Sequence, residues 1–265
     1  MTRFRTALAA LVPLLLLPPA ALAAASAWVA TPGGDVRLVA LPADASGRVR
    51  AMLDIRLHDG WKTYWRDPGG AGIPPALTAT GARLEAVRFP VPKRLGDAEL
   101  HYVGYDAPVA LPLTLTDVSG PVTLSVFLGV CKEICIPVQA ELGVDPRQEA
   151  FANPLEETAI AAAEAKLPPA AAEDLAPLSG RWSADGKTLT VRFRAPEGGG
   201  PPEVYVSGPD DIQFGPAGAA RRDGEAYVAD VPVLYRPKAF DAAAGPVLLA
   251  VRIGTRTMEA PLAIE

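Results

Sequence analysis

Residues 122–144 read VTLSVFLGVCKEICIPVQAELGV and contain the only two cysteines of the chain, Cys131 and Cys135. The apolar segments on either side, residues 122–130 and 136–144, each predict a β-strand. In a straight strand, residues four apart would lie about 13 Å from each other, whereas the Cα atoms of a disulfide lie about 4.4–6.8 Å apart. A bond between the cysteines therefore requires a sharp turn, and the stretch predicts a β-hairpin whose exposed tip is the Cys-x-x-x-Cys loop.

The first 27 residues have the composition of a secretory signal. Arg3 and Arg5 supply the positive charge, an apolar core follows at residues 11–17, and small residues suitable for cleavage come next. The core is shorter than the roughly 20 residues that span a bilayer. We therefore expect residues 1–27 to be a signal peptide, and the mature protein to be soluble and periplasmic, with no membrane insertion after cleavage.

Charge and composition narrow the classes of function. The chain carries 30 acidic and 25 basic residues, a formal net charge of −5, and only two histidines, His58 and His101. An acidic protein is unsuited to bind nucleic acid or an anionic membrane surface. Two histidines do not supply a His-rich metal site, and no Ser-His-Asp or paired-carboxylate arrangement is readable. We therefore expect no nucleic-acid partner, no cofactor and no bound metal.

Short apolar segments between turn residues indicate an all-β protein. The chain has 28 prolines and 24 glycines, which suit a turn-rich β fold more than a helical one. The segments that predict strands are residues 36–40, 50–57, 84–89, 109–115, 122–128, 138–144, 187–193, 203–207, 226–233 and 247–253. Their spacing predicts two β-sandwich domains, residues 28–146 and 178–265. The second has no Cys, no His and no acids at catalytic spacing, which indicates a scaffold or docking role.

Residues 147–177 between these domains predict a linker with one short helix. Asn153 is a favourable N-cap and is followed directly by proline, which suits the first helical position. Ile160, Ala163 and Leu167 fall on one face at helical spacing. The pattern predicts a spacer helix that packs on one of the two domains.

The short spacing of the cysteines allows three interpretations. A staple across about five residues stabilises a fold by only roughly 2 kcal/mol, against about 4.7 kcal/mol for a hundred-residue loop, and strained exposed disulfides are the more easily reduced ones. The pair is therefore a redox-active dithiol, a structural disulfide in a binding or assembly module, or a pair of thiolates that handles Cu(I). Copper-delivery proteins of the Sco type add a downstream histidine, whereas His58 and His101 both lie upstream of the pair.

Several further motifs occur in order along residues 28–144. They are Trp61-x-x-Tyr64-Trp65-x-x-Pro68-Gly69, Pro74-Pro75, Phe89-Pro90, Gly96, Tyr102-x-x-Tyr105 and Val130-Cys131-x-x-x-Cys135-Ile136-Pro137. In this combination the segment resembles the periplasmic N-terminal domain of the DsbD family of thiol:disulfide interchange proteins, including its ScsB-like relatives.

The resemblance implies an immunoglobulin-like sandwich that carries a redox cysteine pair on adjacent strands. It assigns Cys131 and Cys135 as the reactive pair, bonded to each other when oxidised, and we expect Cys135 to face the partner. It also implies that Tyr64, Tyr102 and Tyr105 shield the pair.

The same resemblance implies a function and partners. Such a domain relays reducing equivalents between a membrane-embedded thiol electron donor of the DsbD or CcdA type and periplasmic thioredoxin-fold proteins, a protein-disulfide reductase chemistry that also serves cytochrome c biogenesis. Full family members add a multi-span membrane domain and a thioredoxin-like domain, and the sequence shows neither. We therefore expect a relay that borrows its membrane donor.

Overall fold

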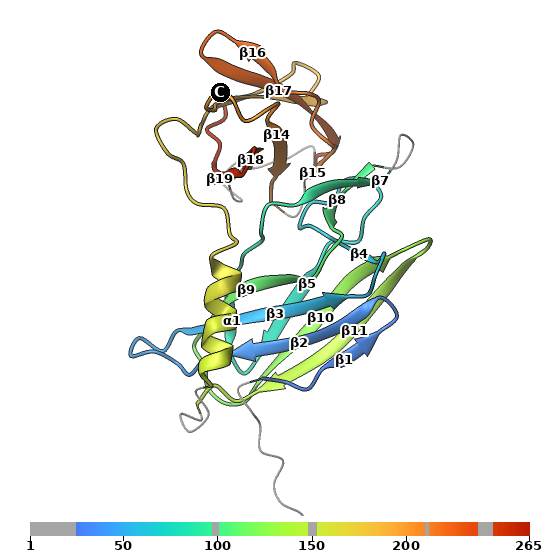
Figure 1. Ribbon diagram of the computed structural model, residues 1–265, viewed down its shortest axis with the longest axis vertical. Helices are drawn as coiled ribbons and strands as arrows, with labels where there is room; N and C mark the ends of the chain where they lie inside the picture. The colour runs from blue at the N-terminus through green and yellow to red at the C-terminus, as the bar shows by residue number, and fades with distance from the viewer. Residues whose placement is uncertain (1–24, 97–100, 148–152, 210–211, 238–245) are drawn as a thin grey trace, which may run out of the picture.

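The computed structural model describes residues 25–96, 101–147, 153–209, 212–237 and 246–265 (Figure 1). These residues form strands β1–β19 and one helix, α1, so the prediction of an all-β protein is confirmed. The expected signal peptide falls almost wholly on residues 1–24, which lie outside the described residues. Among the described residues, no helix has the length and apolar character needed to cross a membrane.

Strands β1–β11 form an immunoglobulin-like first sandwich of two antiparallel sheets. One sheet has the strand order β1 (Val29–Thr31), β2 (Gly34–Ala40), β3 (Val49–Leu57), β9 (Val109–Thr116) and β6 (Arg83–Val87). The other has the order β11 (Cys135–Val144), β10 (Val122–Cys131), β4 (Lys62–Tyr64), β8 (His101–Tyr105) and β7 (Lys93–Gly96), and β5 (Ala76–Thr80) also pairs with β10.

Alternation of side chains explains why these strands pack as two layers. In β3, Leu53 and Ile55 point into the core and are almost wholly buried, whereas Arg50 and Arg56 point outward and are exposed. Each buried aliphatic side chain of this kind stabilises the fold by about 1.5–3 kcal/mol relative to exposure. The core between the sheets therefore carries the fold without a dense set of disulfides.

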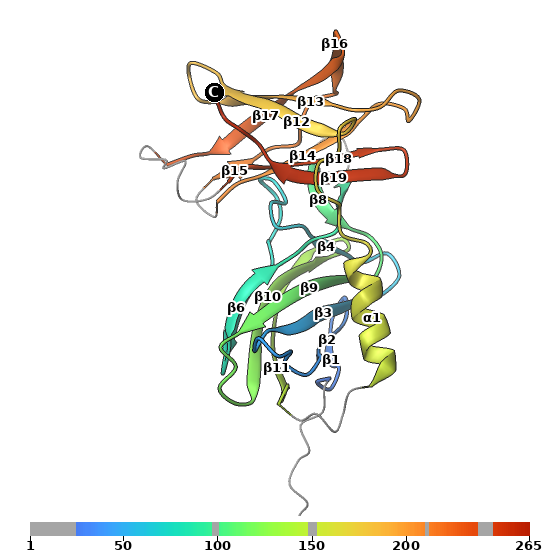
Figure 2. The same cartoon turned by 90° about the vertical axis from the view of Figure 1, so that its left-hand side faces the viewer.

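The helix α1 (Pro154–Glu164) covers the outer face of the first sheet, against β2, β3 and β9 (Figure 2). The side chain of Asn153 caps it by accepting a hydrogen bond from the backbone N–H of Leu155 at 3.0 Å. Ile160 packs against Val39 and Met52 in a small apolar cluster of its own. The predicted helix, its cap and its packing on one domain are confirmed.

Strands β12–β19 form the second sandwich. One sheet contains β12 (Ala176–Trp182), β13 (Thr188–Arg194), β17 (Ala226–Tyr235), β15 (Gln213–Phe214) and β16 (Arg221–Asp223). The other contains β14 (Glu203–Ser207), β18 (Leu248–Ile253) and β19 (Arg256–Pro261). Val191 and Leu249, one from each sheet, are both wholly buried in a shared core that is separate from that of the first sandwich.

The two sandwiches are joined by side chains that cross between them. Tyr205 belongs to the second sandwich but is buried with the core of the first, where its ring packs edge-to-face on Trp65 at 6.2 Å between centroids. Oδ2 of the buried Asp67 accepts a hydrogen bond from the backbone N–H of Phe214 at 3.2 Å. Burial raises the pKa of Asp67 to about 6. The junction is thus built from both apolar and polar contacts.

Ile160 offers a test of the helix packing. Replacing a wholly buried Ile by Ala removes apolar contacts and leaves a cavity, so Ile160→Ala should lower the free energy of unfolding by about 2–5 kcal/mol. Leu155→Ala, on the exposed face of the same helix, is the matched control and should change it by less than about 0.5 kcal/mol. Urea denaturation of both variants measures the difference, and equal effects would contradict the packing described.

Asp67 offers a test of the junction. The pKa of Asp67 is about 6 in the folded protein, against an ordinary value of 3.8 that applies to the unfolded chain. The folded state therefore binds the proton more tightly. Its contribution to stability is therefore fully present below about pH 4 and is lost as the pH rises to about 6, by about 3 kcal/mol. Relative to Asp67→Asn, the wild type should lose stability across this window and stay level above it. Urea unfolding from pH 4 to pH 7 gives the difference, and a flat difference would contradict the burial of this carboxyl.

Candidate functional site

The strands β10 and β11 form the predicted hairpin. They pair antiparallel without a break, from Val122 opposite Val144 to Cys131 opposite Cys135. Three exposed residues close the turn, and the backbone N–H of Lys132 donates to the carbonyl oxygen of Ile134 at 3.3 Å. The hairpin prediction is therefore confirmed, and the turn brings the two cysteines directly opposite each other.

The two sulfur atoms differ in their surroundings. Both cysteines are free thiols, and their Sγ atoms lie 2.6 Å apart. Cys131 is buried, with 7% of its surface exposed, whereas Cys135 is exposed. The cause is their place in the sheet. β10 pairs with β4 and β5 as well as with β11, whereas β11 pairs with β10 alone among the described residues. An edge strand leaves Cys135 open on one side.

Two tyrosines lie against the cysteine pair. The Tyr64 hydroxyl is 2.8 Å from Sγ of Cys135, in a hydrogen bond in which either atom can donate. The ring of Tyr64 meets that of Tyr102 edge-to-face at 5.4 Å between centroids. Both rings are buried with Cys131 in one cluster, with Ile73 and Leu95 packed around it. The structure thus brings Tyr64 and Tyr102 together with the two cysteines.

Tyr105, which the resemblance also groups with the pair, does not join this cluster. It lies in the main core of the first sandwich, and its hydroxyl donates to the carbonyl oxygen of Pro90 at 2.8 Å. Tyr102 and Tyr105 are three residues apart in the strand β8. Because side chains alternate along a strand, the two rings lie on opposite faces of the sheet.

Two glycines make room for the ring of Tyr64. A Cβ atom added at Gly129 would lie 2.8 Å from Cε2 of Tyr64, and one added at Gly72 would lie 2.8 Å from Cδ1. Both distances are too short for a side chain, so the ring rests directly on backbone. Sequence reasoning missed this contact, although a glycine inside a strand is a signal of close approach.

The electrostatics differ between the hydroxyl and the buried thiol. Burial, together with hydrogen bonds to the two sulfurs, raises the pKa of Tyr64 above its ordinary value, so the hydroxyl keeps its proton and can donate to a thiolate. Burial also raises the pKa of Cys131, while the Tyr64 hydrogen bond and the positive charge of Lys62 act in the opposite direction. Lys62 lies opposite Cys131 in the pairing of β4 with β10. Sequence reasoning also missed this cation.

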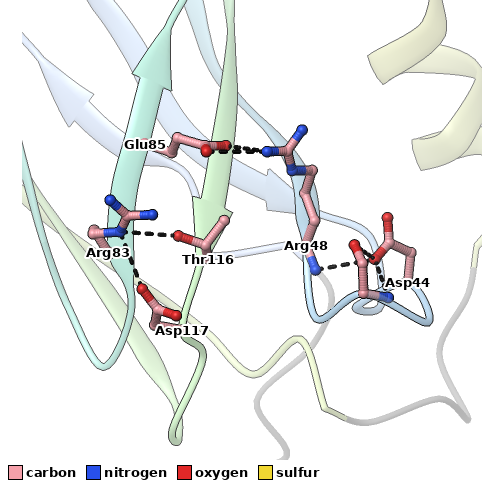
Figure 3. Close-up of polar contacts among 7 residues, drawn as sticks. Asp44, Arg48, Arg83, Glu85, Thr116 and Asp117 are labelled. Carbon is pink, nitrogen blue, oxygen red and sulfur yellow. Dashed lines mark hydrogen bonds and ion pairs between the residues drawn. The ribbon is translucent and has the colours of Figure 1, made fainter.

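Charged side chains gather at the opposite end of the first sandwich, where Figure 3 draws Arg48 beside Glu85 and Arg83 beside Asp117. These ion pairs measure 2.7 Å and 3.0 Å. Asp117 lies before the start of β10, and Cys131 is the last residue of that strand. The length of β10 therefore separates the charged cluster from the cysteines. Exposed pairs of this kind contribute about 0–1 kcal/mol each. The cluster therefore contributes little to the stability of that end of the sandwich.

Metal ligands do not gather elsewhere in the part of the chain that the structure describes. Within those residues, no group of three or more His, Cys, Asp or Glu side chains is placed to hold a metal ion. His58 and His101 are both exposed. Neither belongs to the cluster formed by the cysteines and the two tyrosines.

Comparison with known proteins finds a family model that matches the first sandwich. Residues 35–144 match the family model described as "Thiol:disulfide interchange protein DsbD, N-terminal". This part of the first sandwich is similar to that family. The match takes in both sheets of the sandwich and ends with β11, so it includes Cys131, Cys135, Tyr64 and Tyr102.

A solved structure shares the fold over both sandwiches. The N-terminal periplasmic domain of ScsB from Proteus mirabilis matches at a TM-score of 0.71 and 23% identity, covering 91% of this chain and 99% of that chain. The likeness thus extends beyond the DsbD family match into β12–β19. The adhesin InvE from Yersinia pseudotuberculosis (15% identity, 86% of this chain, 58% of that chain) reaches a TM-score of only 0.21. No curated protein matches the chain.

The difference in burial between the cysteines predicts a difference in reactivity. In the single-cysteine variants, Cys135 (in Cys131→Ser) should react with iodoacetamide several-fold faster than Cys131 (in Cys135→Ser). Cys131 is buried, and burial raises its pKa and so lowers its thiolate fraction. Second-order rates at pH 7 measure this in the folded proteins. In denaturant the two rates should be equal, and equal rates in the folded proteins would contradict the asymmetry.

Proposed function

We propose that this chain is a periplasmic thiol:disulfide exchange protein that relays reducing equivalents through Cys131 and Cys135, to or from exported oxidoreductases. The observation that carries the proposal is the exposed Sγ of Cys135, 2.6 Å from the buried Sγ of Cys131, in a sandwich that matches the DsbD N-terminal family model. An exposed sulfur is available to a partner protein, and the adjacent buried sulfur is available to complete the exchange.

The exchange follows from this arrangement. The Cys135 thiolate attacks a sulfur of the partner's disulfide, so that a mixed disulfide forms and the partner's other sulfur leaves as a thiolate. The Cys131 thiolate then attacks Sγ of Cys135, which forms the Cys131–Cys135 disulfide and releases the second partner sulfur. The partner gains two electrons and takes up two protons, and the reverse sequence carries electrons in the other direction.

Tyr64 and Tyr102 have distinct roles in this proposal. The Tyr64 hydroxyl donates a hydrogen bond to the Cys135 thiolate and stabilises its charge. The two rings cover the side of the site on which Cys131 is buried, so that small thiols and oxidants reach Cys131 less readily than Cys135. Shielding of this kind directs the exchange to partners that engage the hairpin tip.

The family match and the expected signal peptide support a proposal for the partners. We assign a membrane-embedded thiol electron donor of the DsbD or CcdA type on one side and periplasmic thioredoxin-fold proteins on the other. At the tip, Ile134 is exposed over 69% of its surface and lies next to Cys135. An exposed apolar side chain beside the reactive sulfur offers such partners a contact that excludes water.

Covalent trapping in cells tests the exchange. In Cys131→Ala the exposed Cys135 can still form a mixed disulfide but nothing resolves it, so partner-linked bands should accumulate on non-reducing gels. In Cys135→Ala the remaining thiol is buried, and such bands should be several-fold weaker.

The double variant Cys131→Ala/Cys135→Ala is the control and should give no bands. The redox state of the wild-type pair adds a second reading, since it should differ between strains with and without the membrane electron donor. The proposal fails if neither single variant traps a partner and the wild-type pair stays oxidised in both strains. Full function of the double variant in a complementation assay would point instead to a structural disulfide.

A further inference from the structure

One short segment contacts both the cysteine pair and the second sandwich. Tyr64, whose hydroxyl contacts Cys135, is followed directly by Trp65, whose ring packs on Tyr205. Tyr64 ends β4, and the two rings lie in separate apolar clusters, Tyr64 with Cys131 and Trp65 in the core of the first sandwich. A single peptide unit therefore separates the contact with the thiol from the contact with the second sandwich.

The next two residues continue the contact through polar groups. Arg66, four-fifths buried, forms an ion pair with Glu259 of the second sandwich. Asp67 accepts the hydrogen bond from the backbone N–H of Phe214 described above. Three consecutive residues, 65–67, thus hold the second sandwich by an aromatic contact, an ion pair and a hydrogen bond.

The strand that carries Tyr102, β8, lies beneath the second sandwich in Figures 1 and 2, and its neighbour β7 contacts that sandwich. Arg94 of β7 donates to the carbonyl oxygen of Val204 at 3.3 Å. The backbone N–H of Val103 in β8 donates to the carbonyl oxygen of Pro68 at 3.0 Å, which ties this strand to the same short segment. Both tyrosines at the cysteine pair therefore lie on elements that the second sandwich holds in place.

We propose that the second sandwich is a brace, which positions Tyr64 on Cys135 through residues 65–67 and so sets the reactivity of the exposed thiol. Glu259 and Tyr205 act here as positioning residues, because neither touches a sulfur atom. The biological meaning of the brace rests on the proposed exchange function. Its physical content, the control of one thiol by a neighbouring sandwich, does not depend on any partner.

Alkylation of Cys135 in the full-length Cys131→Ser protein tests the brace. Adding Glu259→Gln leaves the buried Arg66 without its ion-pair partner, which destabilises the local arrangement of residues 65–67. The Tyr64 hydroxyl then loses its position, and the rate with iodoacetamide at pH 7 should fall about fivefold, the effect of losing one ordinary hydrogen bond.

The matched control is Glu197→Gln. Glu197 also forms an ion pair with an arginine, Arg222 of β16, but this pair lies within the second sandwich and is exposed. Its loss should leave the Cys135 rate within twofold of the starting protein. Thermal unfolding of each variant shows that it is folded, and Tyr205→Leu, which removes the aromatic contact instead, serves if Glu259→Gln does not fold.

A double-mutant cycle separates positioning from general loosening. Tyr64→Phe removes only the hydroxyl and should lower the rate by a similar factor on its own. If the brace acts through that hydroxyl, adding Glu259→Gln to Tyr64→Phe should change the rate by less than about twofold. An unchanged rate in Glu259→Gln, or the same fivefold drop in both backgrounds, overturns the proposal.

These outcomes are independent of the trapping experiment. A protein that traps partners but shows no coupling between Glu259 and Tyr64 keeps the exchange function and loses the brace. A protein that shows the coupling but traps no partner keeps the brace and loses the relay.

Discussion

The register of β10 and β11 is the constraint on which the site depends. Cys131 stands opposite Cys135 only because the turn between them has three residues and the ten pairs behind it run without a bulge. Leu124 and Leu128 hold this register, since they alternate into the core and a slip by one residue would turn them toward solvent. The packing of the sandwich thus fixes the distance between two sulfur atoms at its rim.

The position of each strand in its sheet determines which of the two sulfurs is buried and which is exposed. β10 has neighbouring strands on both sides, and Tyr64 of β4 covers the end of β10 that carries Cys131. β11 is an edge strand, and Pro137, which has no N–H to offer, lies two residues from Cys135. Edge strands attract unwanted pairing, and proline is one of the residues that blunts it. The exposed thiol therefore stands on an edge that a partner can reach but that is poorly suited to strand addition.

The sequence was sufficient for the hairpin, for most long strands and for the capped helix, because each depends on local periodicity and turn chemistry. It was insufficient for β4, because three residues are too few to show an alternation of apolar and polar side chains. This strand nevertheless carries Tyr64, which contacts Cys135. Tyr105 was grouped with Tyr102 by motif, whereas an explicit assignment of β8 as a strand would have separated them by face. The junction was also out of reach, since the bond from Phe214 to Asp67 links residues 147 positions apart and no local signal encodes it.

The polar contacts of the junction are better explained by the orientation that they impose than by the stability that they add. Burial lowers the pKa of Arg66 to about 10 and raises that of Asp67 to about 6, so both are charged at pH 7 although both are poorly solvated. Apolar residues of similar volume are often as stabilising as buried ion pairs or more so. An apolar contact such as that of Trp65 with Tyr205 tolerates sliding, whereas a hydrogen bond and an ion pair are directional. Charged groups at these positions therefore fix one orientation of the second sandwich, and with it the segment that begins at Tyr64.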